Sequence, residues 1–209
     1  MIVTVHCTSS VASIWLAPRI ADFHAQHPDV QIHLRTAEFP ADQIVERGTD
    51  LSIVRLPANT EPEEKMRKLW DARIFPVCSP EYLARHGPFA SPDQLCGQDL
   101  IHTLGYNNDW HRWARKFASP RTQVKAGFSV DGLVISIEAA CRSEGIILGR
   151  SPLIDPFIQN GRLVEALPGN PGLKSSYLLT TGSRAPNKRS TKLFVEWIVR
   201  QAKAHSKQS

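Results

Sequence analysis

The sequence predicts an α/β protein with a mainly parallel sheet. Stretches with strand patterning alternate with stretches whose apolar residues recur at helical spacing, and this alternation is typical of parallel strands joined by crossover helices. The chain has 209 residues, enough for one large domain or two small α/β subdomains with cores of their own. Its composition, 42% apolar and 22% charged, is that of an ordinary globular protein, and no apolar run reaches the length that spans a bilayer.

The chain is expected to open with a strand followed by a helix. Residues 2–7 alternate in polarity as a strand does, and the three hydroxyl residues after them favour a helix N-terminus. The apolar residues of segment 12–23 then share one helical face. Pro18 lies inside this helix and removes a backbone donor, so we expect a kink or a break there. The His27–Pro28 pair should end the helix.

The remaining elements follow from the same patterns. Alternating or short buried apolar runs predict further strands at residues 30–35, 50–54, 69–78, 100–104, 124–130, 145–149, 162–167 and 176–181. Helical spacing and capping residues predict further helices at residues 40–47, 80–86, 109–117, 131–142, 152–159 and 187–203. In the helix at 109–117, Trp110 and Trp113 lie three residues apart and are expected to anchor the core.

Charge and the start of the chain give coarse expectations about location and partners. The net charge is +5, and part of the excess lies between Lys188 and Lys207. A basic segment can attract nucleic acid, but a solvated helix face explains this one better, because no zinc finger or glycine-aromatic RNA motif accompanies it. The first residues lack the basic and long apolar regions of a signal peptide, so we expect a cytoplasmic protein.

Neither the spacing of the cysteines nor any known catalytic motif indicates an enzyme. Cys7, Cys78, Cys96 and Cys141 form no C-x-x-C pair and no zinc-type spacing, so we expect four free thiols. A redox-sensing thiol is the alternative, and it would need an exposed cysteine of low pKa. No nucleophile elbow, H-E-x-x-H, Walker loop or G-x-G-x-x-G occurs, and Glu63–Glu64 is read as a solvated loop pair. We therefore expect no enzymatic activity, no cofactor and no metal.

An ordered set of segments carries a family resemblance over nearly the whole chain. These segments are Thr8–Ser10 with Trp15–Phe23 and His27–Pro28, then Gly48–Arg55, Pro76–Leu83 with His86–Gly87, Trp110 and Trp113, Ile137–Ala140, Gly145–Ile146 and Asn160–Val164. The set resembles the effector-binding domain of LysR-type transcriptional regulators. The segment at 76–87 and the paired tryptophans are similar to the subgroup that contains glycine-cleavage and β-lactamase regulators.

The resemblance implies two Rossmann-like subdomains joined by two crossover strands, as in type II periplasmic binding proteins. Here the crossovers would be residues 72–78 and 176–182. Subdomain I would comprise residues 1–75 and 180–209, and subdomain II residues 76–179. The effector site would lie in the cleft between them, because ligands of open α/β sheets bind beyond the carboxyl ends of the strands.

Two helix starts are the main candidates for effector binding. Thr8, Ser9 and Ser10 lie where a strand ends and a helix begins, so free N–H groups and the helix dipole there suit a carboxylate. The alternative is simple N-capping, which needs only one of the three residues. Ser129 and Asp131 mark a second helix start, where Asp131 either caps the helix or accepts from a ligand amine; we favour capping.

Three further residues are candidates at strand ends. Arg55 follows a buried strand and could clamp a carboxylate with both guanidinium nitrogens, or it could be a plain solvated arginine. His102 ends a short strand, and a satisfied half-buried histidine is its alternative role. Tyr177 lies on the second crossover strand, where its hydroxyl could reach a ligand.

The function that the resemblance implies is ligand sensing for transcription. A small, carboxylate-bearing metabolite would favour a closed arrangement of the subdomains. The domain would form a homodimer or homotetramer through strand 30–35 and the first helix, and would have no membrane partner. DNA would be bound only through a winged helix-turn-helix that these 209 residues lack, so we expect a shortened or stand-alone sensing domain. The alternatives are a solute-binding protein of the same architecture and a two-domain α/β enzyme such as a transferase.

Overall fold

The computed structural model describes residues 1–38, 48–57, 66–106, 108–182 and 188–205, and the chain forms two compact units. Unit 1 comprises Met1–Ala72 and Lys174–Ser209, and unit 2 comprises Arg73–Leu173. The chain thus changes unit at 72/73 and 173/174, where the sequence analysis placed the changes at 75/76 and 179/180. The predicted helix at 40–47 and the Glu63–Glu64 pair lie outside the described residues.

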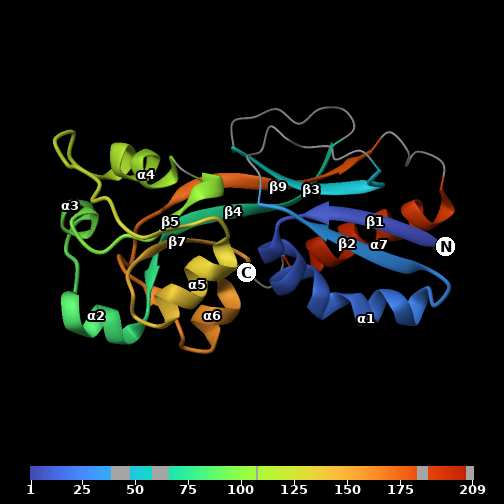
Figure 1. The fold of residues 1–209 in the computed structure, drawn as a ribbon, viewed down its shortest axis with the longest axis horizontal. Coiled ribbons are helices and arrows are strands. Elements are labelled where there is room, and N and C mark those ends of the chain that lie inside the picture. The colour runs from blue at the N-terminus through green and yellow to red at the C-terminus, as the bar shows by residue number, and fades with distance from the viewer. Residues whose placement is uncertain (39–47, 58–65, 107, 183–187, 206–209) are drawn as a thin grey trace. The chain divides into compact units, whose positions relative to one another are not determined.

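The sheet of unit 1 is parallel on one side only, whereas a mainly parallel sheet was predicted. Its strands are β2 (Gln31–Thr36), β1 (Ile2–Cys7), β3 (Leu51–Pro57), β9 (Leu173–Thr181) and β4 (Met66–Cys78), in that order (Figure 1). Strand β1 runs parallel to both β2 and β3, whereas β9 returns antiparallel to β3. The carboxyl ends of β1, β2 and β3 therefore meet at one edge of the sheet.

The first helix changes type at the predicted break. It begins with a π-helical segment, η1 (Val11–Leu16), and continues as α1 (Ala17–Gln26). The Ala17 N–H still donates to the Ala12 carbonyl five residues back, but Pro18 has no N–H to extend that pattern. The predicted break at Pro18 is confirmed, and it takes the form of a π-to-α transition.

Aromatic packing joins α1 to the C-terminal helix α7 (Arg189–His205). The Phe23 ring makes edge-on contacts with Phe194 and Trp197, at centroid distances of 5.3 and 5.2 Å. The Trp197 indole N–H donates to the Asp22 carboxylate at 2.7 Å. Offset and edge-on rings add about 0.5–1.5 kcal/mol per pair beyond the apolar area they bury. This contact holds two helices far apart in sequence within unit 1.

Unit 2 has short strands and many helices. The second part of β4 pairs antiparallel with β7 (Ile147–Arg150) and β8 (Val164–Glu165), and β5 (His102–Thr103) pairs parallel with β6 (Ser129–Val130). The helices of unit 2 are α2 (Pro80–His86), α3 (Pro92–Cys96), η2 (Leu104–Tyr106), α4 (Asp109–Phe117), α5 (Leu133–Cys141) and α6 (Asp155–Gln159). None of the helices in the described ranges is long and apolar enough to cross a membrane.

The core of unit 2 is built on the two predicted tryptophan anchors. Trp110 and Trp113 are buried, and their rings meet edge-on at 5.8 Å. The Trp110 indole N–H donates to the Ile101 carbonyl at 3.0 Å, and the Trp113 indole N–H donates to Asn170 Oδ1 at 3.3 Å. Both indole N–H groups thus have an acceptor inside the core, and the prediction of these residues as core anchors is confirmed.

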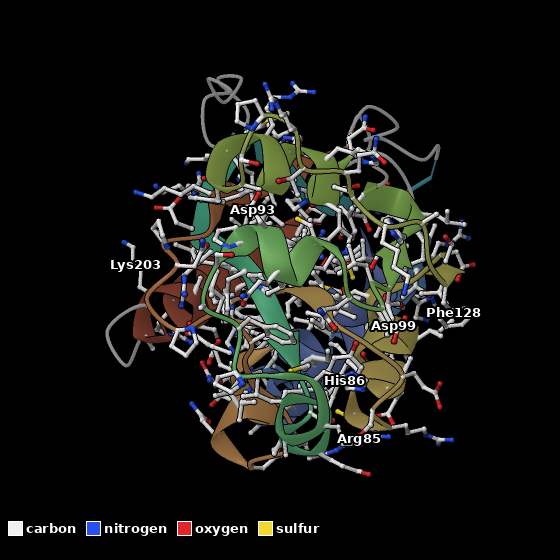
Figure 2. The ribbon with its side chains drawn as sticks, turned by 90° about the vertical axis from the view of Figure 1, so that its left-hand side faces the viewer. Arg85, His86, Asp93, Asp99, Phe128 and Lys203 are labelled. Atoms are coloured by element: carbon white, nitrogen blue, oxygen red, sulfur yellow. The ribbon has the colours of Figure 1, made fainter. Side chains whose placement is uncertain are left out.

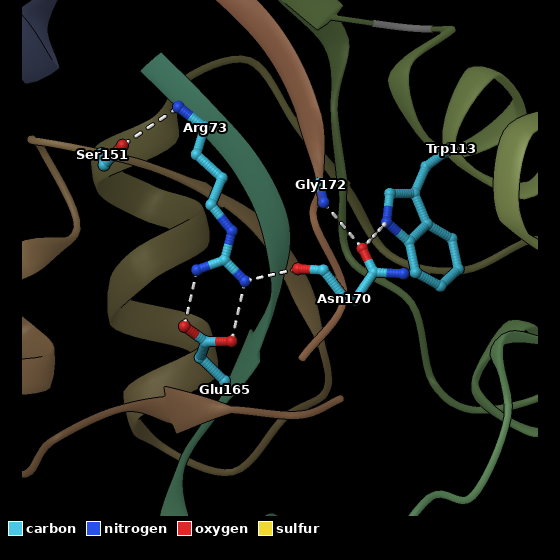
Figure 3. Close-up of polar contacts among 6 residues, drawn as sticks. All are labelled: Arg73, Trp113, Ser151, Glu165, Asn170 and Gly172. Carbon is cyan, nitrogen blue, oxygen red and sulfur yellow. Dashed lines mark hydrogen bonds and ion pairs between the residues drawn. The ribbon is translucent and has the colours of Figure 1, made fainter. Parts of the chain in front are cut away.

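A polar network lies beside the point where β4 enters unit 2. The Arg73 guanidinium makes a bidentate ion pair with Glu165, at 2.7 and 2.8 Å, and also donates to the Asn170 carbonyl (Figure 3). Asn170 Oδ1 accepts from the Trp113 indole and from the Gly172 N–H. Gly172 has a φ of +71°, and a Cβ there would lie 2.6 Å from the Ile74 carbonyl oxygen. Glycine is required at this close approach.

A buried ion pair connects α4 to β7. The Arg150 guanidinium lies 2.6 Å from Asp109 Oδ2, and the two side chains are only 1% and 6% exposed. Arg150 also donates to the Leu148 carbonyl, and its guanidinium lies 3.6 Å from the centre of the Tyr106 ring. Buried charges require such partners, because each loses its hydration shell on folding.

Three predicted strands are much shorter than expected, and of the predicted strand 100–104 only His102–Thr103 forms a strand. Only 129–130 of the predicted strand 124–130, and 164–165 of the predicted strand 162–167, pair with a neighbour. The segment before β6 runs along the surface instead, and Phe128 is 57% exposed (Figure 2). This segment alternates in polarity but makes few hydrogen bonds to another strand. Alternation alone cannot distinguish such a surface segment from a paired strand.

Candidate functional site

The eight predicted site residues fall into two groups, one in each unit. Thr8, Ser9, Ser10, Arg55 and Tyr177 belong to unit 1, and His102, Ser129 and Asp131 belong to unit 2. Within each unit the topology brings the candidates close in the sheet: Arg55 faces Tyr177 in the β3–β9 register, and His102 faces Ser129 in the β5–β6 register.

The hydroxyls at the first helix start bind one another and the backbone. Thr8 Oγ1 lies 3.0 Å from Ser10 Oγ, and the Val11 N–H donates to Thr8 Oγ1 at 3.4 Å. The Ala12 N–H donates to the Thr8 carbonyl at 3.0 Å. Thr8 therefore acts as a capping residue, which is the alternative role considered for one of the three.

Glu38, which was not among the predicted residues, contacts the first helix start. Its carboxylate accepts from the Ser9 backbone N–H at 2.9 Å and also from the Ser9 hydroxyl. A carboxylate at a helix N-terminus gains about 0.3–1 kcal/mol from the dipole. No local signal in the sequence singles Glu38 out: it follows β2, and it reaches the helix start only because β2 ends beside β1, where Cys7 pairs with Thr36. This edge of unit 1 thus holds a carboxylate of the chain itself.

Arg55 and Tyr177 lie beside an aromatic stack. The Tyr177 ring stacks on Trp70 at 5.1 Å, and the Trp70 ring meets Trp15 at 4.4 Å. Tyr177 is buried and Arg55 is half-buried, so neither is a plain surface residue. Trp15 and Trp70 come from η1 and β4, and the sequence analysis treated both as ordinary members of their elements.

The candidates of unit 2 are more exposed. His102 is half-buried, and its Nε2 lies 3.2 Å from the Lys125 carbonyl. Ser129 and Asp131 are both exposed. The predicted capping role of Asp131 is wrong: α5 begins at Leu133 with Gly132 at the N-cap and no side-chain cap. Because the helix starts later than expected, Asp131 lies before the cap position.

Burial keeps the cysteines protonated. It raises the pKa of the Cys7 and Cys78 thiols to about 12, with the Glu38 charge adding to the effect at Cys7. It raises the pKa of Cys96 to about 11 and that of Cys141 above its ordinary value. All four are free thiols, as predicted. Low thiolate content is the opposite of what a redox-sensing thiol requires.

We therefore expect slow alkylation of the folded protein. At pH 8 a thiol of pKa about 12 is ionised in about one molecule in ten thousand, so Cys7 and Cys78 should react with iodoacetamide at least about 100-fold more slowly than in the unfolded chain. Peptide mass spectrometry over time measures each site. Cys141 is half-buried and should be labelled first, which serves as an internal control. Rapid labelling of Cys7 in the folded state would contradict this prediction.

The described residues do not point to a metal-binding site. Among them, no group of three or more histidine, cysteine, aspartate or glutamate side chains could hold a metal ion. The arrangement in unit 1 instead offers hydrogen-bond donors, a guanidinium and aromatic rings, which are the groups that recognise a small organic anion.

Sequence comparisons assign relatives to nearly the whole chain. Residues 2–203 match the family described as LysR substrate binding domain. The HTH-type transcriptional regulator DsdC of Escherichia coli K12 is 28% identical over 97% of this chain and 66% of its own length. The glycine cleavage system transcriptional activator of the same strain is 27% identical over 96% of this chain and 65% of its own length. The chain spans about 65% of the length of these relatives.

Solved structures show the same fold. The effector domain of the transcriptional regulator AmpR of Pseudomonas aeruginosa is similar with a TM-score of 0.79 and 20% identity, covering 100% of this chain and 98% of that one. The regulatory domain of CrgA from Neisseria meningitidis, a LysR-type regulator, is similar with a TM-score of 0.80 and 21% identity, covering 97% and 98%. The architecture is thus that of effector-binding domains with a type II periplasmic-binding-protein fold.

Proposed function

This chain belongs to the family of LysR substrate-binding domains, and from that membership we propose that it senses a small, carboxylate-bearing metabolite. The observation that carries the proposal is the pair of donors at Ser9, which holds the Glu38 carboxylate at the edge where three parallel strands end. A group that binds one carboxylate there has the chemistry to bind another.

The proposal includes the predicted residues of each unit. Thr8, Ser9 and Ser10 would offer hydroxyls and backbone N–H groups, and Arg55 and Tyr177 would offer a guanidinium and a phenol. His102, Ser129 and Asp131 would serve from unit 2, where exposure leaves Ser129 and Asp131 accessible. Binding would favour one arrangement of the units over another, since a ligand shifts an equilibrium only by its differential affinity for the two states.

The role of the whole protein is part of the proposal. The relatives are named as transcriptional regulators, and the chain corresponds to about two thirds of their length. We propose that the complete protein binds DNA through a helix-turn-helix module outside these residues, acts in the cytoplasm, and assembles as a homodimer or homotetramer through β2 and the first helix.

A thermal-shift screen tests the sensing role. Amino acids, aromatic carboxylates and short cell-wall peptides would each be added at millimolar concentration. A ligand present at 100 times its Kd stabilises the folded state by about 2.7 kcal/mol. For a chain of this size we therefore expect the melting temperature to rise by about 5–10 °C for at least one carboxylate.

Paired variants locate the effect. Ser9→Ala removes a donor at the proposed site and should weaken binding of the stabilising compound about tenfold. Ser13→Ala, on the same helix, removes an exposed hydroxyl that donates only to the Ser9 carbonyl, and should leave binding unchanged. If no compound stabilises the protein at millimolar concentration, the sensing role is wrong.

A further inference from the structure

The hydrogen-bond donors of unit 1 form two groups, those that have an acceptor within the chain and those that have none. At the first helix start, the Ser9 N–H and hydroxyl donate to Glu38, and Thr8 and Ser10 lie within hydrogen-bond distance of each other. These donors already have acceptors within the chain. A ligand that binds there must replace an existing partner.

Five buried polar groups of unit 1 stand in contrast, because they have no hydrogen-bond partner within the described part of the chain. Two are the hydroxyls of Ser52 and Thr191, and the other three are Trp15 Nε1, Trp70 Nε1 and Ser175 Oγ. The last three residues are 2%, 3% and 1% exposed. Buried donors are almost always paired, so each such group requires an explanation such as a bound molecule. Trp197, also buried in unit 1, donates to Asp22 and shows the ordinary situation.

Trp15, Trp70 and Ser175 are related through the ring of Tyr177. The Trp15 and Trp70 rings lie 4.4 Å apart, and the Trp70 ring stacks on Tyr177 at 5.1 Å. Side chains alternate along a strand, so Ser175 and Tyr177 lie on the same face of β9, and β9 is the neighbour of β4 in the sheet (Figure 1). The Trp15 and Trp70 rings are therefore in contact, and Ser175 lies on the face of β9 that carries Tyr177, the ring stacked on Trp70.

The carboxyl edge of the same sheet adds a positive charge on that face. Arg55 pairs with Tyr177 in the β3–β9 register, so the two residues lie on one face. A ligand with an oxygen acceptor attached to a flat apolar body would complement this set of groups. The acceptor would accept from the two N–H donors, the hydroxyl and the guanidinium, and the body would stack on the aromatic rings. Such a site would bind compounds that carry the acceptor much more tightly than compounds that lack it, because the latter leave the buried donors unpaired.

We propose that Trp15, Trp70 and Ser175 receive the carboxylate of the effector, and that the effector carries this carboxylate on an aromatic ring. The inference rests on the proposed sensing function but places the carboxylate at these buried donors and not at the helix start. Ser9→Ala distinguishes the two placements, because it weakens carboxylate binding only if the helix start holds the carboxylate. Because the donors are enclosed, the ligand reaches them only after a change of rotamer or a shift of η1. Binding is therefore coupled to a conformational change, as a sensor requires.

Indole resonances test the proposal directly. The protein has five tryptophans, and ¹⁵N labelling gives one indole N–H signal for each. Benzoate and acetate are the probes, and ethylammonium, which has no acceptor, is the control. We expect benzoate to shift the Trp15 and Trp70 signals, acetate to shift them at higher concentration, and ethylammonium to have no effect. The Trp197 signal should stay in place.

Matched variants keep the proposal falsifiable. Trp70→Phe and Ser175→Ala remove one donor each while preserving most of the packing, and each should weaken benzoate binding about tenfold. Trp197→Phe removes a paired indole N–H in the same unit and should leave benzoate affinity unchanged. Ser175→Ala deletes only an unpaired hydroxyl, so this variant should unfold at or above the wild-type temperature without ligand, which shows that it folds.

The outcomes separate the two proposals. If a carboxylate raises the melting temperature but moves neither indole signal, sensing stands and this assignment is wrong. If no carboxylate binds, both are wrong. If the Trp15 and Trp70 protons show cross-relaxation to a long-lived water that persists in saturating benzoate, water satisfies the donors and the assignment is overturned.

Discussion

Replacing Asp109 by asparagine is expected to lower the free energy of unfolding by about 3–5 kcal/mol. The substitution keeps the side-chain size but leaves the Arg150 guanidinium, 1% exposed, without its anionic partner at 2.6 Å. An uncompensated charge in the interior costs far more than the ion pair contributes, because its lost hydration is no longer offset. Urea unfolding followed by circular dichroism measures the difference.

Two further variants identify the cause. Glu81→Gln breaks the exposed Arg85–Glu81 pair of the same unit and should change stability by no more than about 1 kcal/mol. Asp109→Leu combined with Arg150→Met removes both charges and should cost less than Asp109→Asn alone. Equal losses for the double and single variants would mean that packing, rather than the unpaired charge, dominates.

Gly172→Ala should destabilise the protein by about 2–5 kcal/mol. Alanine loses about 1–2 kcal/mol in the left-handed region, where Gly172 has a φ of +71°. Its Cβ would also lie 2.6 Å from the Ile74 carbonyl oxygen, a backbone atom that moves only if β4 shifts, and such overpacking costs about 1–3 kcal/mol. The melting temperature and the urea midpoint both report this loss.

Gly169 provides the matched control. It also has a positive φ, +81°, but a Cβ there meets no atom within 4 Å. Gly169→Ala should therefore show only the conformational cost, about 1–2 kcal/mol. If the two alanine variants are equally stable, the close approach at Ile74 contributes nothing and the second part of the prediction is wrong.

The fold was largely predictable because its signals are local. Strand 2–7, the helix break at Pro18 and the buried Trp110 and Trp113 all follow from spacing within a few residues. The prediction for segment 124–130 failed for the opposite reason: its apolar residues look like a strand, but only its last two residues, Ser129 and Val130, pair with a neighbouring strand. Pairing depends on distant segments, and a single sequence does not reveal it.

The candidate site was predictable only in part. The hydroxyls of Thr8–Ser10 mark a strand-to-helix junction, and this was visible in the sequence. The role of Glu38 depends on β2 lying parallel beside β1, and the stacking of Trp70 on Tyr177 depends on β4 and β9 being neighbours. These contacts join residues that are far apart in the chain, so residue type alone could not single them out.

The position of β9 also sets an order of events during synthesis. In unit 1 this strand lies between β3 and β4, so the two earlier strands have no direct pairing to make. A growing chain that has reached residue 173 has completed unit 2 but still lacks the strand that joins the sheet of unit 1. Closing long loops is slow, and unpaired strand edges invite aggregation until they are covered. Until β9 has been synthesised, β3 and β4 therefore each keep an open edge, whereas every residue of unit 2 is already available.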